Sequence, residues 1–301
     1  MASQAIYLYR RIYQLAAALV RLAGPGEEAL RRLGNRVDGA IQRLLKVPSG
    51  VPNPLTFEGH RFYHGGLPSW TVQGMFLGTY EQETLHLLWR LLKPGMTFVD
   101  LGAHIGCYTV MGATIVGETG RVYAFEPCPE NADLLARNVV LNGHEERVRI
   151  VRKAVADTTG EAVLMVDVED TGSSSMISQG DDSTRSITVP TTSLDEFFAG
   201  EGWPKVDLVK MDIEGAEIAA LRGMAELSRR NPDLKLIVEF SPKRIAATNS
   251  TPADFFAALQ AVSFSRFWHI GPNLVHLAIP RDIDRLVRVA RYKGVNLLCL
   301  K

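Results

Sequence analysis

The sequence has few cysteines, no long apolar run near its N-terminus and no excess of charge. Only three of its 301 residues are cysteine, too few and too scattered for a disulfide framework or a CxxC metal site. We therefore expect buried thiols and a reducing, cytoplasmic compartment. The longest apolar run near the N-terminus is Leu15 to Val20, far short of the roughly 18 residues that span a membrane. With no clear cleavage signature beside it, we expect neither a signal peptide nor a transmembrane helix.

The charges balance over the whole chain. Lysine and arginine together number 33, as do aspartate and glutamate, so the formal net charge is zero. A nucleic-acid-binding protein would show a basic stripe and a high pI, so nucleic acid is not an expected partner. The hydrophobic content of 46% and charged content of 22% are those of a folded globular protein, long enough for a sizeable core.

The same charges are unevenly distributed along the chain. Residues 1–56 carry eight basic and three acidic residues, which gives +5 and leaves −5 for the remainder. Residues 4–22 show the periodicity of an amphipathic helix with a thin basic stripe. Three prolines then break the chain: Pro48, Pro52 and Pro54. We therefore divide the chain into an N-terminal helical arm, 1–56, and a main domain, 57–301.

The arm has three candidate roles. Its wide apolar face could pack on the main domain or on a second copy of the chain, which would give a homodimer. Its basic stripe and tyrosines could instead attach to a membrane surface, or the arm could cover a substrate site. A polar segment from Thr171 to Ser186 is interpreted either as a lid over a substrate or as a solvated linker.

The main domain alternates strand-like and helix-like patterns from residue 96 onward. Strands are expected at 97–101, 122–125, 147–155, 206–211 and 236–240, with helices at positions such as 131–141 and 216–227. Near-continuous apolar strands separated by helices predict an α/β fold whose parallel sheet is covered on both faces. Such sheets bind ligands beyond the carboxyl ends of their strands, so the functional residues are expected there.

A glycine-rich turn follows the first strand. Its characteristic residues are Asp100, Gly102 and Gly106. Glu126 ends the second strand, twenty residues after Gly106. This combination is typical of a nucleoside cofactor, whose ribose hydroxyls bind the acid. The glycine spacing is G-x-x-x-G rather than the dinucleotide pattern G-x-G-x-x-G, and Asp100 would repel a pyrophosphate but suit an ammonium group. We therefore expect S-adenosylmethionine, with its adenine near Ala154, and consider an NAD-dependent oxidoreductase the disfavoured alternative.

Acidic residues follow the next two strands. The fourth strand runs into Lys210, Asp212 and Glu214, and the fifth ends at Glu239. Methyl transfer to a hydroxyl needs a group that removes its proton, and Asp212 or Glu239 could be that base, with Lys210 or His104 stabilising the developing alkoxide. Alternatively, Asp212 and Glu239 could hold one Mg²⁺ that acidifies the hydroxyl. Glu214 is either a site residue or an acid that favours a helix dipole.

Together, these motifs resemble the FkbM family of S-adenosylmethionine-dependent methyltransferases. The resemblance covers roughly residues 78–240. Its blocks are Gly78 to Glu81, Phe98 to Gly106, Ala124 to Pro127, Asn131, Asn142-Gly143, Gly172 to Ser175, Val189 to Asp195, Lys210 to Glu217 and Val238 to Phe240. The resemblance implies a Rossmann-like class I methyltransferase with a seven-stranded, mostly parallel sheet. It also implies methyl transfer, usually to a hydroxyl on a sugar, polyketide or other secondary metabolite.

The resemblance also bears on individual residues. It supports Asp100, Gly102 and Glu126 as cofactor contacts, and Asp212 and Glu214 as site residues. Within the same blocks, further candidate cofactor contacts are Ala103, Gly106, Pro127 and Asn131. His104 stands where the family often has asparagine.

The sequence thus predicts an O-methyltransferase acting on a small hydroxylated acceptor. N-methylation within the same fold is the nearest alternative, because an amine needs only deprotonation. A non-catalytic, membrane-docked binding protein is a third class, suggested only by the basic arm.

Overall fold

The computed structural model describes residues 51–66, 70–167, 184–291 and 294–301. Most of the predicted arm 1–56, with its proposed dimer, membrane and lid roles, lies outside these residues. So does most of the polar segment predicted at 171–186, which includes the Gly172 to Ser175 block. Within the described ranges, no helix combines the length and apolar character needed to cross a membrane.

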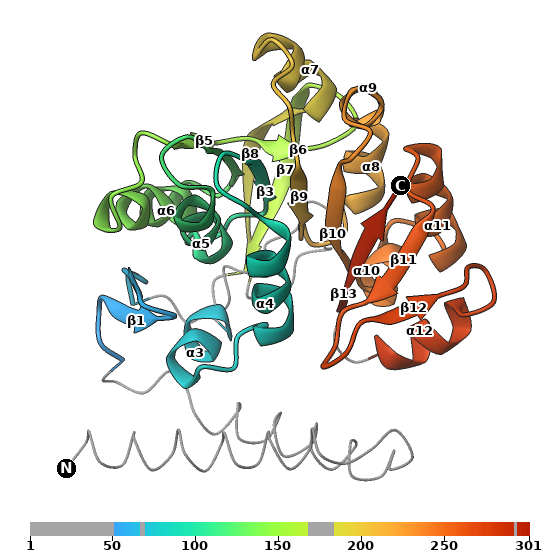
Figure 1. Cartoon of the computed structure of the whole chain (residues 1–301), viewed down its shortest axis with the longest axis horizontal. Coiled ribbons are helices and arrows are strands. Elements are labelled where there is room, and N and C mark those ends of the chain that lie inside the picture. The colour runs from blue at the N-terminus through green and yellow to red at the C-terminus, as the bar shows by residue number, and fades with distance from the viewer. Residues whose placement is uncertain (1–50, 67–69, 168–183, 292–293) are drawn as a thin grey trace.

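An eight-stranded sheet forms the centre of the described chain (Figure 1). Its order is β12-β11-β13-β10-β9-β3-β4-β5. Neighbours from β5 to β10 are parallel, and β13, β11 and β12 continue the sheet with antiparallel pairings. The strands are β3 (Thr97–Leu101), β4 (Arg121–Phe125), β5 (Val148–Val151), β9 (Leu208–Met211), β10 (Lys235–Phe240), β11 (Arg266–His269), β12 (Val275–Leu277) and β13 (Val295–Leu300).

This topology confirms the predicted open, mostly parallel α/β sheet but corrects two details. The sheet has eight strands rather than seven, because the short β12 pairs with β11 at the edge. The strand expected at 147–155 is divided. The chain leaves the main sheet at Arg152, and Ala154–Val155 forms β6, which pairs with β8 (Thr184–Thr192) of a second sheet. Polar Arg152 and Lys153 interrupt the apolar pattern where the chain changes sheets.

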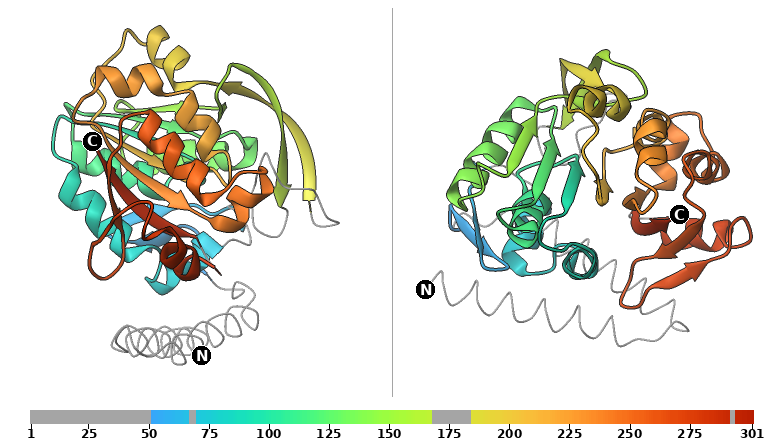
Figure 2. Two further views of the ribbon diagram at one scale, coloured as in Figure 1. Left: turned by 90° about the vertical axis from the view of Figure 1, so that its right-hand side faces the viewer. Right: turned by 45° about the horizontal axis from the view of Figure 1, so that its top comes forward.

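The second sheet has the order β6-β8-β7 and consists mainly of a long hairpin. β7 (Gly160–Asp167) pairs antiparallel with β8 over its whole length. The left-hand view of Figure 2 shows the pair as a curved ribbon at the margin of the molecule. Leu164, Val166 and Val189 pack against Cys128 and Ala154. The hairpin is therefore anchored beside the carboxyl ends of β4 and β5.

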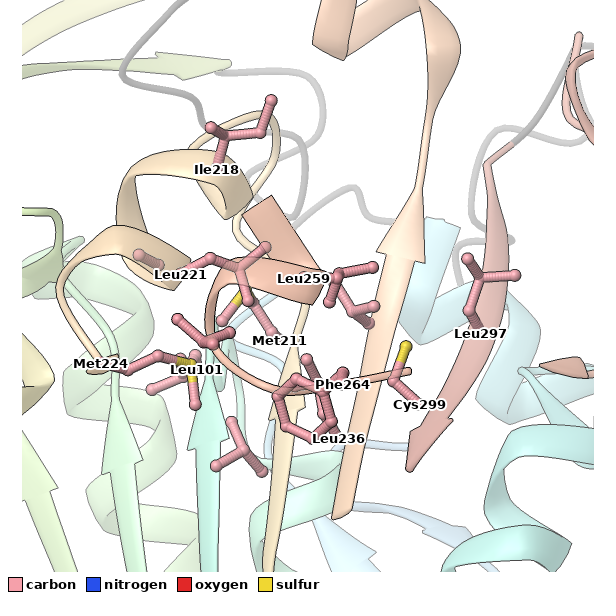
Figure 3. Close-up of a cluster of buried hydrophobic side chains, with 14 of the residues drawn as sticks. Leu101, Met211, Ile218, Leu221, Met224, Leu236, Leu259, Phe264, Leu297 and Cys299 are labelled. Carbon is pink, nitrogen blue, oxygen red and sulfur yellow. The ribbon is translucent and has the colours of Figure 1, made fainter. Parts of the chain in front are cut away.

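Helices cover both faces of the main sheet because successive strand residues point to opposite sides. Phe98, Leu208 and Ile237 belong to one core, with α4 and α5. Leu101, Met211 and Leu236 belong to the other, with α8 and α11 (Figure 3). The helices are α3 (Trp70–Leu77), α4 (Gln82–Leu91), α5 (Cys107–Val116), α6 (Pro129–Leu141), α7 (Leu194–Gly200), α8 (Glu217–Arg222), α9 (Ala225–Arg230), α10 (Pro242–Ala247), α11 (Pro252–Ala261) and α12 (Ile283–Val289). A short hairpin of β1 (Leu55–Phe57) and β2 (His60–Phe62) joins the α4 side.

The helix expected at 216–227 is in fact two helices, α8 and α9. They separate at Gly223, where a Cβ atom would lie 2.4 Å from the carbonyl oxygen of Ala156. The chain after β6 therefore passes so close that the helical segment bends around it.

Candidate functional site

The turn after β3 depends on Gly102. Its φ is +79°, and a Cβ atom there would lie 1.9 Å from the carbonyl oxygen of Asp212. A side chain would therefore be strained and would also collide with the chain after β9. The N–H groups of Gly102 and Ala103 donate to the carbonyl oxygen of Phe125 at 3.0 and 2.9 Å. The turn is thus fixed between the ends of β4 and β9.

Glu126 lies directly against this turn. Its carboxylate accepts hydrogen bonds from the backbone N–H groups of His104 (2.7 Å) and Cys128 (2.9 Å) and, at 3.5 Å, from the side-chain amide of Asn131. Burial raises the pKa of Glu126 to about 7, although these hydrogen bonds oppose the shift. The carboxyl group is therefore fixed in orientation and titrates near neutral pH.

A pocket opens between the glycine turn, the ends of β4 and β9 and the β7–β8 hairpin. It contains about 550 Å³ of empty space, part of it open to solvent. The residues named on sequence grounds that line it are Gly102, His104, Glu126, Pro127, Asn131, Ala154, Asp212 and Glu214. Residues that were not candidate site residues complete the lining: Phe125, Lys153, Val155, Leu164 and Ile213. Phe125 and Ile213 directly adjoin named residues, whereas Leu164 reaches the pocket only through the hairpin.

Three of the candidate cofactor residues lie beneath the pocket lining. Asp100 is buried, and its Oδ2 accepts a hydrogen bond of 2.6 Å from the Thr109 hydroxyl, while its Oδ1 has no partner among the described residues. Burial raises the pKa of Asp100, opposed by the charge of Lys210. Ala103 packs with Leu135, and Gly106 lets α5 begin close to the same side chain, where a Cβ would lie 2.6 Å from it.

Three carboxylates gather beyond the ends of β9 and β10. Asp212, Glu214 and Glu239 each offer an oxygen, and these atoms all lie within 4.8 Å of one another. Lys210 Nζ lies 3.0 Å from Asp212 Oδ2, and Arg244 forms an ion pair with Glu214. Burial raises the pKa of Glu239 well above its ordinary value, and the charges of Asp212 and Glu214 raise it further. The charges of Asp212 and Glu214 are therefore balanced by cations, whereas Glu239 favours its neutral form.

The two residues expected to stabilise an alkoxide differ in charge. Burial lowers the pKa of His104 to about 4, so its imidazole is neutral near pH 7. Burial also acts to lower the pKa of Lys210, but the carboxylates of Asp212, Glu81 and Asp100 raise it above its ordinary value. Lys210 is only 2% exposed and lies outside the pocket lining. Its charge therefore reaches the pocket through Asp212.

Two acids outside the predicted site hold this region in shape. Glu217 Oε1 accepts hydrogen bonds from the N–H groups of Ile213 (3.1 Å) and Gly215 (3.2 Å), which closes the loop after β9. Glu81, at the start of α4, accepts a hydrogen bond from the Tyr108 hydroxyl, and the Tyr108 ring centroid lies 4.4 Å from Lys210 Nζ. Glu81 belongs to the Gly78 to Glu81 block of the family resemblance, but the sequence assigned it no role.

Comparison with known proteins decides the family. A model of the methyltransferase FkbM domain matches residues 100–265, more than half of the chain. The chain belongs to the FkbM methyltransferase family. Membership confirms the predicted family and enzyme class, and with them S-adenosylmethionine as the cofactor.

This FkbM methyltransferase is similar to two curated relatives over part of their length. It is 28% identical over 145 residues to the hexuronic acid methyltransferase AglP of Haloferax volcanii, a match that covers 48% of this chain and 56% of the relative. It is 25% identical over 156 residues to the methyltransferase sdnD of Sordaria araneosa, covering 42% of this chain and 60% of the relative. The match thus spans less than two thirds of either relative.

Among solved structures, the chain is similar to an S-adenosylmethionine-dependent O-methyltransferase from Thermotoga maritima. The two are 16% identical, with a TM-score of 0.39, and the match covers 74% of this chain and 65% of the other.

Proposed function

We propose that this protein transfers the methyl group of S-adenosylmethionine to a hydroxyl group of a small acceptor, a sugar or another hydroxylated metabolite. The observation that carries this proposal is the position of Asp212, which lines the cofactor pocket and also belongs to the carboxylate cluster. The similarity to a hexuronic acid methyltransferase supports a sugar-like acceptor.

The residues around the pocket fit the predicted cofactor. Glu126 would accept hydrogen bonds from ribose hydroxyls, and Gly102, which has no room for a side chain against the Asp212 carbonyl oxygen, keeps the turn at the edge of the pocket. Apolar Phe125, Val155 and Leu164 suit the adenine ring. The unpartnered Oδ1 of Asp100 supports its predicted contact with the ammonium group. When bound, S-adenosylmethionine supplies an electrophilic methyl group on a sulfonium, and its transfer leaves the neutral thioether S-adenosylhomocysteine.

Asp212 is the better candidate for the base. Glu239 favours its neutral form because of burial and the neighbouring charges, so it is poorly suited to take a proton. Asp212 is ion-paired with Lys210, which fixes the carboxylate and balances its charge. In the proposed step, the proton of the acceptor hydroxyl passes to Asp212 as the hydroxyl oxygen bonds to the methyl carbon.

The variant Asp212→Asn tests this role. It keeps the shape of the side chain and an oxygen that can accept from Lys210, but it removes the base. We expect loss of methyl transfer to a panel of hydroxylated acceptors that includes glucuronic acid, with binding of S-adenosylhomocysteine retained in calorimetry. The exposed Asp157→Asn is the control for an equal loss of charge outside the pocket.

Two results would contradict the proposal in different ways. Unchanged turnover in Asp212→Asn would remove Asp212 from the base role. Transfer to amines but to no hydroxyl compound, in a parallel panel, would replace O-methylation by N-methylation.

A further inference from the structure

A row of polar side chains extends from Asp212 across the end of the sheet. On β10, Ile237 belongs to the core under α4 and α5, whereas Val238 belongs to the opposite core. The next residue, Glu239, therefore faces the α4 side, because strand residues alternate. Its register partner on β13 is Asn296, and partners across antiparallel strands share a face. The row thus runs from Asp212 through Glu239 to Asn296.

Asn296 is held in place but only half satisfied. Its Nδ2 donates a hydrogen bond of 3.1 Å to the Thr84 hydroxyl of α4. Its Oδ1 is buried and accepts no hydrogen bond among the described residues. Turning the amide over would exchange the two atoms and would still leave one of them unpartnered. Buried polar groups are nearly always paired, so the unpartnered atom of the Asn296 amide indicates a polar ligand at this position.

Glu239 lies tightly against the chain that leads into β13. A Cβ atom on Gly294 would lie 2.0 Å from Glu239 Oε1, so a side chain there would displace this carboxyl group from its present position. Carboxyl oxygens accept hydrogen bonds, and a side-chain amide both donates and accepts them. Glu239 and Asn296 together therefore offer the hydrogen-bonding partners that a hydroxyl group uses.

The row and the cofactor pocket share only one of these residues. Asp212 lines the pocket, whereas Glu239 and Asn296 do not. Because the acceptor oxygen must approach the methyl carbon in line, from the side away from the sulfur, the acceptor has to enter from outside the cofactor pocket. The row beyond Asp212 offers polar partners outside the lining of the cofactor pocket.

We propose that Glu239 and Asn296 bind a second hydroxyl group of the acceptor, adjacent to the hydroxyl that gives its proton to Asp212. This inference rests on the proposed function and narrows its substrate class to compounds with two neighbouring hydroxyls, as on a sugar ring.

The test compares acceptors that differ by one hydroxyl. Methyl glucuronoside and its monodeoxy analogues form one series, and cyclohexane-1,2-diol with cyclohexanol forms another. For the wild-type enzyme, we expect kcat/KM to be at least tenfold higher with the diol, because a missing hydroxyl leaves buried groups unpaired. In Asn296→Leu this preference should fall at least tenfold, with the larger change in KM for the diol.

Two further variants separate recognition from folding. Glu239→Ala should also reduce the diol preference, and it leaves the Thr84 contact of Asn296 in place. Asn142→Ala removes an asparagine that bonds the Arg61 backbone, away from the row, and should leave the preference unchanged. Thermal unfolding of each variant shows whether it is folded.

The outcomes are distinguishable. Methyl transfer with no preference for diols would overturn the inference, as would a preference that survives both Asn296→Leu and Glu239→Ala. Either result would leave the proposed function standing and would mean that water, and not the acceptor, binds Asn296. The wild-type enzyme could instead bind S-adenosylhomocysteine but methylate no hydroxyl compound. That result would overturn the proposed function and the inference with it.

Discussion

Glu126 shows how burial can prepare a single residue for a ligand. Its carboxyl group is oriented by the N–H groups of His104 and Cys128, yet burial holds its pKa at about 7. The ionised form is the better acceptor for two ribose hydroxyls. A ligand that donates to the carboxylate therefore favours ionisation, and the proton competes with the ligand below the pKa.

We expect the affinity for S-adenosylhomocysteine to fall about tenfold for each pH unit below 7 and to level off above it. Calorimetry between pH 5.5 and 8.5 measures this directly. His104 does not titrate in that range, because its pKa is lowered to about 4. Glu126→Gln should bind more weakly with a flat profile, and a flat wild-type profile would contradict the assignment.

Lys210 makes a second prediction at the scale of one residue. It is buried and balances Asp212, and it also lies within reach of the charges of Asp100 and Glu81. Removing one partner of a buried ion pair leaves an uncompensated charge, which costs about 3–5 kcal/mol. Lys210→Met should therefore lower the melting temperature clearly in calorimetry and reduce kcat through misplacement of Asp212.

Lys205 provides the matched control for that variant. It pairs with Asp207 at 2.6 Å, but its side chain is 71% exposed. An ion pair with an exposed cation contributes little because water and salt screen it, and the buried Asp207 keeps its 2.9 Å hydrogen bond from the Thr97 N–H group. Lys205→Met should leave both the melting temperature and kcat nearly unchanged, and equal losses in the two variants would refute the role given to the buried cation.

At the scale of elements, the strand ends explain what could be predicted. β3, β4 and β9 are short, largely apolar runs followed at once by Gly102, Glu126 and Asp212, and Glu239 is the single acid within β10, so the sequence located these strand ends. It could not locate Leu164 or Asn296, because their positions depend on how a hairpin and an antiparallel strand dock. Nothing in the local pattern distinguished Ala103 and Gly106, which serve packing, from neighbours that line the pocket.

The elements around the acid cluster also bear on the predicted metal. The oxygens of Asp212, Glu214 and Glu239 are close enough for one divalent ion. However, Lys210 on β9 and Arg244 on α10 already pair with two of them, and Mg²⁺ would have to displace these cations to reach octahedral coordination. We propose that methyl transfer needs no metal.

Removal of metal should accordingly have no effect. Treatment with EDTA, followed by assay with and without added Mg²⁺, is expected to give equal rates within error. A loss of activity that Mg²⁺ restores would show instead that the cluster binds a metal ion.

At the scale of the whole molecule, the first described strand is part of the main core. Leu55 and Phe57 of β1 are 1% and 3% exposed, and both pack in the core with α4 and α5. The domain boundary predicted at residue 57 would divide β1. A strand of three residues is too short to be predicted from the sequence pattern. We therefore propose that the main domain begins near residue 51.

Truncation tests this boundary. A chain that begins at residue 51 retains β1 and should fold and bind S-adenosylhomocysteine. A chain that begins at residue 58 loses two buried side chains, each worth about 2–5 kcal/mol, and should unfold at a clearly lower temperature in calorimetry. Equal stability of the two truncated chains would show that β1 is dispensable.

The position of β13 has a consequence for how the protein is made. β13 lies between β10 and β11, although it follows both in the chain. During synthesis, β11 and β12 therefore have no place on the sheet until Val295–Leu300 has left the ribosome, and the edge of β10 stays open until then. An unpaired sheet edge readily pairs with other chains. The same strand that supplies Asn296 thus closes the open edge of β10.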